Sequence, residues 1–263
     1  MNDALILGLF VILPCVAGSL LFLFARNQRK RNLNAGAAPG SESAPESSGG
    51  TGRVGWGRLI FGNTLVFLLL GSLALLAGED PYLFRRARLT DARWIAVLDA
   101  AAALGNWNAP VPAGRARGIA IGKAFNSIVA EVIEISQPAA GSLKVHRVSC
   151  AVDCGRPVNP GSIQAQMQGG IVHGLNATLW GQQTFKAGVA QSANFNRSRM
   201  LRLNEMPQID VTIMPPDPNV PIGGIGEPGV PTVAPALANA YARLTGQRIR
   251  TLPFFPGATM SGL

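Results

Sequence analysis

The most restrictive feature of this 263-residue chain is an abrupt change of character near residues 78–80. Before it, residues 4–25 carry no charge, and residues 59–77 contain only Asn63, Thr64 and Ser72 as polar side chains. At about 1.5 Å of helix rise per residue, the first stretch can cross a bilayer core of roughly 30 Å, and the second is slightly short of it. The sequence therefore predicts a two-helix transmembrane hairpin followed by a separate globular domain.

The hairpin comprises a first membrane helix with its basic flank, residues 1–33, and a second helix, residues 53–78. Between them, residues 34–52 form a linker rich in Ala, Gly, Ser and Pro that we expect to be disordered. A cleaved signal peptide is the alternative, but the first residues lack a positive charge and the basic cluster follows the apolar run, which favours a membrane anchor. Basic residues in the linker predict that it lies in the cytoplasm, although further arginines follow the second helix. We therefore expect the anchor in the inner (cytoplasmic) membrane and the C-terminal domain outside the cytoplasm.

Composition excludes several classes of protein. Charged residues make up only 14% of the chain, against about 25% in ordinary soluble domains, and hydrophobic residues make up 48%. The net charge of +9 comes from scattered Lys and Arg with few aromatic residues between them, so we expect no nucleic-acid partner. Three cysteines are too few for a disulfide framework.

Hydrophobic periodicity predicts a globular domain over residues 79–263. The expected helices are 91–104, 161–180 and 232–244, the last ending at Gly246, and the expected strands are 117–124, 127–136, 143–152, 208–214 and 248–252. The elements mix without a strict alternation of strand and helix, which is typical of the α+β class.

One glycine-rich loop carries the residue with the clearest chemical potential. Gly224, Gly226 and Gly229 fit a dinucleotide-binding pattern, but no strand directly precedes them and no acid follows Glu227, so that interpretation fails. Glu227 is the only acid after Asp217 and stands just ahead of a predicted helix. It is either a general base in a tight loop or an acid favoured by the helix dipole, and the residues alone favour the second.

His146, Cys150 and Cys154 are of metal-ligating types. The cysteines, however, are spaced C-x-x-x-C, and no second pair exists. We therefore expect core packing here and no metal ligand from the protein.

Four segments point to a known family: 112–127, 145–175, 201–211 and 223–240. Together they cover most of the stretch from Asp80 to about Pro253, which resembles the C-terminal part of a molybdenum hydroxylase large subunit. The family is the xanthine dehydrogenase and aldehyde oxidase superfamily, and the isoquinoline 1-oxidoreductase β-subunit type is the most similar. The resemblance implies an α+β molybdopterin-binding domain preceded by the two-helix transmembrane hairpin.

The resemblance also implies roles for particular residues. Glu227 corresponds to the catalytic glutamate, which acts as the base of the reaction. Gln166 corresponds to a glutamine that hydrogen-bonds the molybdopterin of the molybdenum cofactor, and Gly169, Gly170 and Gly226 are expected to let the backbone approach that cofactor. Gln168 stands where relatives usually carry Glu.

The implied activity is oxidation of an N-heterocycle or an aldehyde at a molybdenum–pterin centre, with oxygen derived from water. An Fe–S small subunit is the implied electron acceptor. The family's upstream lobe is missing from this sequence, so we expect the chain to be inactive alone and to have a partner that carries the lobe. The alternative is a membrane-tethered binding or assembly module that kept the fold without the chemistry.

Overall fold

The structure is a computed structural model that describes residues 73–74, 76–137, 143–192, 194, 196 and 198–256. The chain divides into two units, 1–53 and 54–263, and every described residue belongs to the second. The predicted membrane helix at 4–25, the linker and most of the predicted helix at 59–77 lie outside the described residues. Within the described part, no helix is long and apolar enough to cross a membrane. The hairpin therefore has no support from the structure and stays a prediction.

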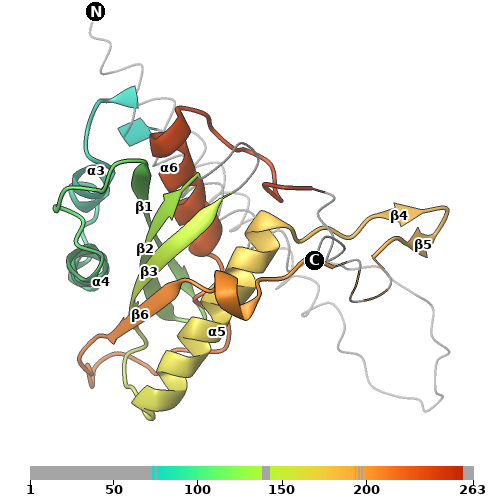
Figure 1. The fold of residues 1–263 in the computed structure, drawn as a ribbon. Helices are drawn as coiled ribbons and strands as arrows, with labels where there is room; N and C mark the ends of the chain where they lie inside the picture. The colour runs from blue at the N-terminus through green and yellow to red at the C-terminus, as the bar shows by residue number, and fades with distance from the viewer. Residues whose placement is uncertain are drawn as a thin grey trace, which may run out of the picture. The chain divides into compact units, whose positions relative to one another are not determined.

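A four-stranded mixed sheet forms the centre of the domain, in the order β1-β2-β3-β6 (Figure 1). Strands β1 (Arg115–Ala124), β2 (Ser127–Ser136) and β3 (Lys144–Asp153) pair antiparallel, and β6 (Gln208–Ile213) runs parallel to β3. A parallel neighbour needs a crossover, and the crossover here contains helix α5 (Pro160–Leu179). These four strands and α5 confirm the predicted elements.

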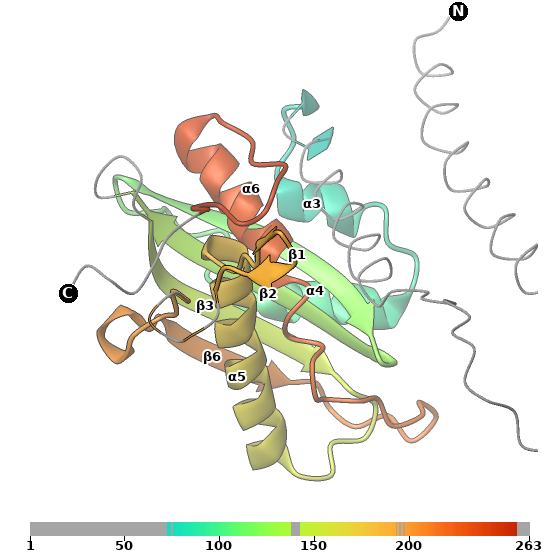
Figure 2. The same ribbon diagram turned by 90° about the vertical axis from the view of Figure 1, so that its right-hand side faces the viewer.

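Helices cover both faces of the sheet (Figure 2). Helices α5 and α6 (Val233–Thr245) pack on one face, and α4 (Ala92–Leu104), preceded by the short α3 (Pro81–Arg86), packs on the other. Alternate residues of β2 serve the two layers: Val129 and Ile133 face α5 and α6, whereas Ala130 and Val132 face α4. Because helices cover both faces, residues 127–133 of β2 and 148–153 of β3 are buried without interruption.

The helix ends follow local sequence signals. Asp91 caps α4 by accepting a hydrogen bond from the Arg93 amide at 2.8 Å, and Asn159 caps α5 by accepting one from the Ser162 amide at 3.0 Å. Gly246 ends α6 in the left-handed conformation, with φ of 73°. The predicted helices and this cap are confirmed.

The predicted strand at 248–252 is wrong. The end of the described chain turns to α5 instead, where the amides of Phe254 and Phe255 bond to the carbonyls of Thr178 and Leu179 at 2.8 Å each. These carbonyls lie at the helix end and lack partners within the helix. The chain at Phe254 and Phe255 therefore bonds to α5 and adds no strand to the sheet.

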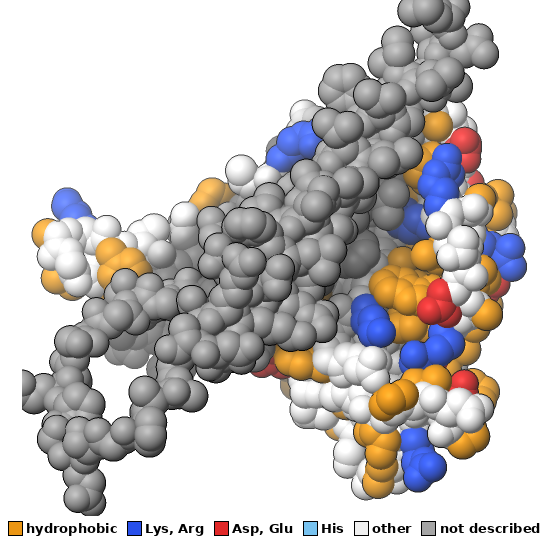
Figure 3. All heavy atoms as spheres, turned by 180° about the vertical axis from the view of Figure 1, so that it is seen from behind, with side chains coloured by type: hydrophobic (Ala, Val, Ile, Leu, Met, Phe, Trp, Pro, Cys, Tyr) orange, Lys and Arg blue, Asp and Glu red, His pale blue; other side chains and the backbone are white. Residues whose placement is uncertain are grey.

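Outside the core lie a small hairpin, β4 (Phe185–Lys186) with β5 (Val189–Ala190), and the short 3₁₀ helix η2 (Leu203–Glu205). Seen from behind the view of Figure 1, the described part of the surface shows Lys and Arg side chains singly or in small groups, between hydrophobic and uncharged side chains (Figure 3).

Candidate active-site loop and cofactor-facing helix

The loop that carries Glu227 is anchored at its beginning by two segments distant in sequence. The Gly223 amide bonds to the Cys154 carbonyl at 2.9 Å, and the Gly224 amide bonds to the Phe125 carbonyl at 2.7 Å. The Ser127 hydroxyl donates to the Gly224 carbonyl at 2.8 Å. Gly223 is required here, since an added Cβ would lie 2.2 Å from the Ser127 hydroxyl oxygen. The loop is thus bonded to the β1–β2 hairpin and to the end of β3.

The second half of the loop packs on α5 and enters α6. An ideal Cβ on Gly229 would lie 3.3 Å from the Met167 carbonyl, and one on Gly170 would lie 3.7 Å from Gly229. One turn further along α5, a Cβ on Gly174 would lie 2.7 Å from the Val233 side chain, too close for any real contact. The glycines on this side of α5 therefore allow the loop and the start of α6 to lie against the helix.

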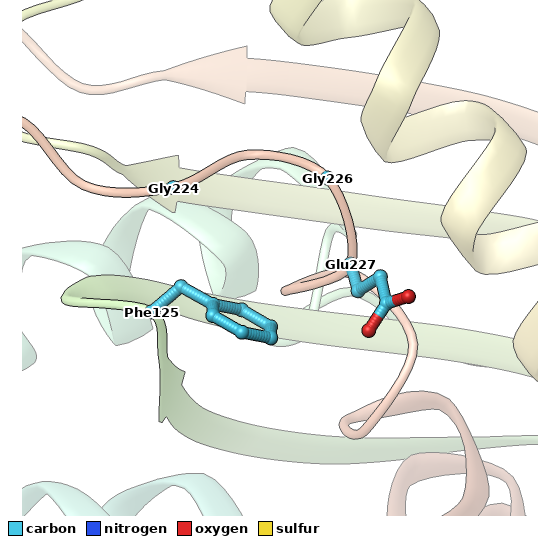
Figure 4. Close-up of a pocket in the computed structure, with 4 residues that line it drawn as sticks. All are labelled: Phe125, Gly224, Gly226 and Glu227. Atoms are coloured by element: carbon cyan, nitrogen blue, oxygen red, sulfur yellow. The ribbon is translucent and has the colours of Figure 1, made fainter. Parts of the chain in front are cut away.

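Between these two anchors, Glu227 lines a cavity of about 500 Å³ together with Phe125, Gly224 and Gly226 (Figure 4). Glu227 is exposed, and an added Cβ on Gly226 would meet no atom within 4 Å. The Phe125 ring, 50% exposed, extends toward Glu227 from the tip of the β1–β2 hairpin (Figure 4). The site thus combines a free carboxylate, an open backbone and an aromatic wall.

Phe125 holds an unusual conformation for an aromatic residue. Phe125 and Asn126 have φ of 51° and 68°, as a two-residue hairpin turn requires, although glycine, asparagine and aspartate dominate such turns. The Phe125 carbonyl and the Asn126 amide group bond to Gly224 and Pro221, which fixes the turn to the loop. Sequence reasoning missed Phe125; an aromatic residue between two adjacent predicted strands was the available signal.

The predicted cofactor-facing residues of α5 occupy different surroundings. Gln166 and Gly169 are exposed, and a Cβ on Gly169 would meet no atom within 4 Å. Gly169 lines a second cavity of about 480 Å³, formed with Gln168, Val172 and three residues that precede or begin β6: Met206, Pro207 and Ile209. Gly170 is half-buried against Gly229. Gly226 and Glu227 thus line the first cavity and Gly169 lines the second, whereas Gln166 lines neither of them.

The cysteines behave as predicted, as core residues. Cys150 and Cys154 are free and buried, and burial raises the pKa of both thiols. His146 bonds to the Ser136 hydroxyl at 2.8 Å. Among the described residues, no group of three or more His, Cys, Asp or Glu side chains could hold a metal ion.

Sequence reasoning also missed Glu131. It lies in the middle of β2, is fully buried, and neither of its carboxyl oxygens has a hydrogen-bond partner. Burial raises its pKa to about 8. The signal was an acid on the same strand face as Val129, Ile133 and Ile135, where only apolar residues are expected.

Comparison with known proteins identifies the domain. Residues 97–207 match the family model described as "Molybdopterin cofactor-binding domain". The match supports the resemblance of this region to the molybdopterin cofactor-binding domain of the xanthine dehydrogenase and aldehyde oxidase family. The region contains Gln166, Gly169 and Gly170, whereas Gly226 and Glu227 follow the matched range.

Two curated relatives are similar over a longer stretch. The beta subunit of isoquinoline 1-oxidoreductase from Brevundimonas diminuta is 37% identical over 193 residues, which is 72% of this chain and 24% of the relative. A nicotinate dehydrogenase subunit from Pseudomonas putida is 30% identical over 70% of this chain and 17% of its own length. The chain therefore spans about a quarter or less of these relatives. Among solved structures, the quinoline 2-oxidoreductase of Pseudomonas putida 86 is 21% identical, with a TM-score of 0.44 over 48% of this chain and 17% of that chain.

Proposed function

We propose that this chain provides the molybdopterin-binding part of a molybdenum hydroxylase that oxidises an aromatic N-heterocycle or an aldehyde with oxygen from water. The observation that carries the proposal is the exposed Glu227 carboxylate in a cavity whose neighbouring backbone, at Gly226, is open to a ligand. The molybdopterin-binding domain and the relatives named as oxidoreductases and dehydrogenases support it.

The residues present fit the cofactor. Gly169 and Gly226 leave their backbone unobstructed, and the Gln166 side chain is exposed and free to hydrogen-bond a pterin edge. When bound, the molybdenum centre supplies the two-electron redox chemistry and activates the oxygen that is transferred. Glu227 would accept the proton released in that activation at its carboxylate oxygens. The anchored loop keeps this base in place without rearrangement.

A flat heterocycle suits the cavity better than a small aldehyde. The Phe125 ring forms one wall opposite Glu227, and an aromatic ring stacks favourably on such a wall by about 0.5–1.5 kcal/mol beyond simple burial. Relatives named for isoquinoline and nicotinate agree with this preference.

The test is Glu227→Gln in the assembled, cofactor-loaded enzyme. Loss of a general base lowers kcat by about 10²- to 10⁴-fold, while molybdenum content should stay unchanged. Asp217→Asn is the matched control, because Asp217 belongs to the same loop and its carboxylate bonds only locally, to the Asn219 amide at 2.9 Å. A normal kcat in the Glu227→Gln enzyme would refute the proposed role of Glu227 as the general base.

The activity would require further components. We propose that additional polypeptide completes the cofactor pocket, that an Fe–S subunit accepts the electrons, and that residues 4–25 and 59–77 anchor the chain in the inner membrane. Purified alone, the chain should then contain no molybdenum, and stoichiometric metal would contradict this. A chain that folds stably and never acquires molybdenum in any assembly would favour the non-catalytic binding or assembly module.

Resistance of the full chain to carbonate extraction from membranes would support the membrane anchor, and release of the chain would refute it.

A further inference from the structure

A buried carboxylic acid, Glu131, lies near Thr232, at the end of the loop that carries Glu227. Glu131 occupies the centre of β2, directly between Ala120 of β1 and Cys150 of β3. Its side chain projects from the face that packs against α5 and α6, and it is fully buried. The neighbouring polar group on that side is Thr232, which immediately precedes α6.

The environment of Glu131 favours the neutral form of its carboxyl group. An isolated buried carboxylate is costly enough that the group protonates instead. Around it, β1 presents Ala120, β3 presents the Cys150 thiol, α5 presents apolar residues of the core, and the start of α6 presents Thr232. No cation among the described residues contributes to its pKa, which burial raises to about 8.

Thr232 complements a neutral acid. It is 1% exposed, its hydroxyl has no hydrogen-bond partner, and it does not cap α6 with its side chain. The hydroxyl lies close enough to counteract the effect of burial on Glu131, although the two groups do not yet meet hydrogen-bond geometry. A protonated carboxyl and a hydroxyl each offer one donor and at least one acceptor, so a small side-chain rotation lets them satisfy each other.

Thr232 connects this buried group to the site. Glu227 stands five residues earlier, and the intervening turn is closed by the Val230 amide bonding to the Glu227 carbonyl at 3.0 Å. The first part of the loop is anchored by hydrogen bonds of Gly223 and Gly224, whereas its second part is held by the packing of Gly229 on α5.

We propose that Glu131 is a positioning residue: as a neutral acid it pairs with Thr232 and fixes the loop that presents Glu227. The importance of this for catalysis rests on the proposed function, whereas the positioning itself does not. Ionising Glu131 removes its donor and leaves a buried charge, so the anchored loop is most stable where the acid stays protonated.

The test is hydrogen exchange of the full chain between pH 5 and 8, corrected for intrinsic rates, in peptides covering residues 224–236. Opening exposes Glu131 and lets it ionise, so wild-type protection should fall by up to tenfold per pH unit up to pH 8 and then level off. Glu131→Gln keeps a donor and cannot ionise, so its protection should match wild type at pH 5 and stay flat. Glu131→Met, apolar and of similar volume, should lose loop protection at least tenfold at pH 5 while β1 and α4 stay protected.

Two further variants keep the test decisive if a Glu131 variant does not fold. Thr232→Val should lower loop protection as Glu131→Met does, and Thr232→Ser should preserve it. Glu134→Gln, on the same strand but bonded to Arg115 and Arg117, is the control and should leave the wild-type pH dependence of the loop intact.

Three results would overturn the proposal: flat wild-type protection, a pH dependence that survives in Glu131→Gln, or full loop protection in both Glu131→Met and Thr232→Val. None of these measurements uses molybdenum or substrate. An active Glu227→Gln enzyme would thus refute the base and leave the loop anchor standing.

Discussion

Gly169 and Gly174, five residues apart on α5, differ in what requires glycine. Gly169 is expected to leave room for the cofactor, whereas Gly174 leaves room for the protein's own packing. An added Cβ on Gly169 would meet open space, whereas one on Gly174 would lie 2.7 Å from the Val233 side chain and 3.0 Å from the Val230 carbonyl. If Gly169 is glycine so that the cofactor can come close, alanine there should harm cofactor binding and not folding. At Gly174, alanine should harm folding and not cofactor binding.

The expected magnitudes follow from these contacts. Alanine in place of glycine inside a helix stabilises by roughly 0.5–1 kcal/mol, so Gly169→Ala should raise the free energy of unfolding by about that amount. Gly174→Ala has the same propensity gain, but overpacking costs about 1–3 kcal/mol. The Val230 carbonyl belongs to the backbone and cannot rotate away. The net effect at Gly174 should therefore be a loss of about 0.5–2 kcal/mol.

Urea denaturation of the chain at fixed pH measures the stability of both variants, and metal analysis of the assembled enzyme measures their molybdenum content. Gly169→Ala should be more stable than wild type yet hold several-fold less molybdenum. If its molybdenum content is normal, Gly169 does not face the cofactor. If Gly169→Ala is destabilised by more than about 1 kcal/mol, the reasoning from open space around its Cα is itself wrong.

Three further perturbations test other parts of the molecule. The pKa of Glu131 is raised from 4.5 to about 8, so its contribution to stability is fully present below pH 4.5 and is lost as pH rises toward 8, by at most about 5 kcal/mol; urea titrations should show this loss for wild type and not for Glu131→Gln. Arg93→Met removes the partner of Asp153, bonded at 2.8 Å, and should cost about 1–3 kcal/mol at pH 7. Because the bond with Arg93 lowers the pKa of Asp153, this difference should shrink as pH falls below 4, and an unchanged difference would contradict the ion pair. Phe125→Leu in the assembled enzyme should raise KM for an aromatic heterocycle by about 2- to 10-fold and leave an aliphatic aldehyde unaffected; equal effects on both would refute stacking.

Local structure was largely predictable because it depends on neighbours within a few residues. The alternation in β2, the capping residues Asp91 and Asn159, and the terminal glycine of α6 each set an element through contacts inside that element. The failed strand at 248–252 shows the limit. Its sequence permits a strand, but the chain just after it, at Phe254 and Phe255, bonds through its amides to the carbonyls at the end of α5.

The sequence by itself determined the main elements, the glycine-rich loop and, through four motif segments, the resemblance to molybdopterin-binding domains. It could not place Phe125 beside Glu227, since a hairpin tip and a loop about a hundred residues later meet only when the sheet and both helix layers have packed. Nor could it show that Glu131 loses all contact with water, because burial on both faces of β2 depends on helices from opposite ends of the domain. Periodicity acts over a turn or a strand, whereas cavities and buried charges are set by contacts between distant segments, and only the tertiary structure decides those.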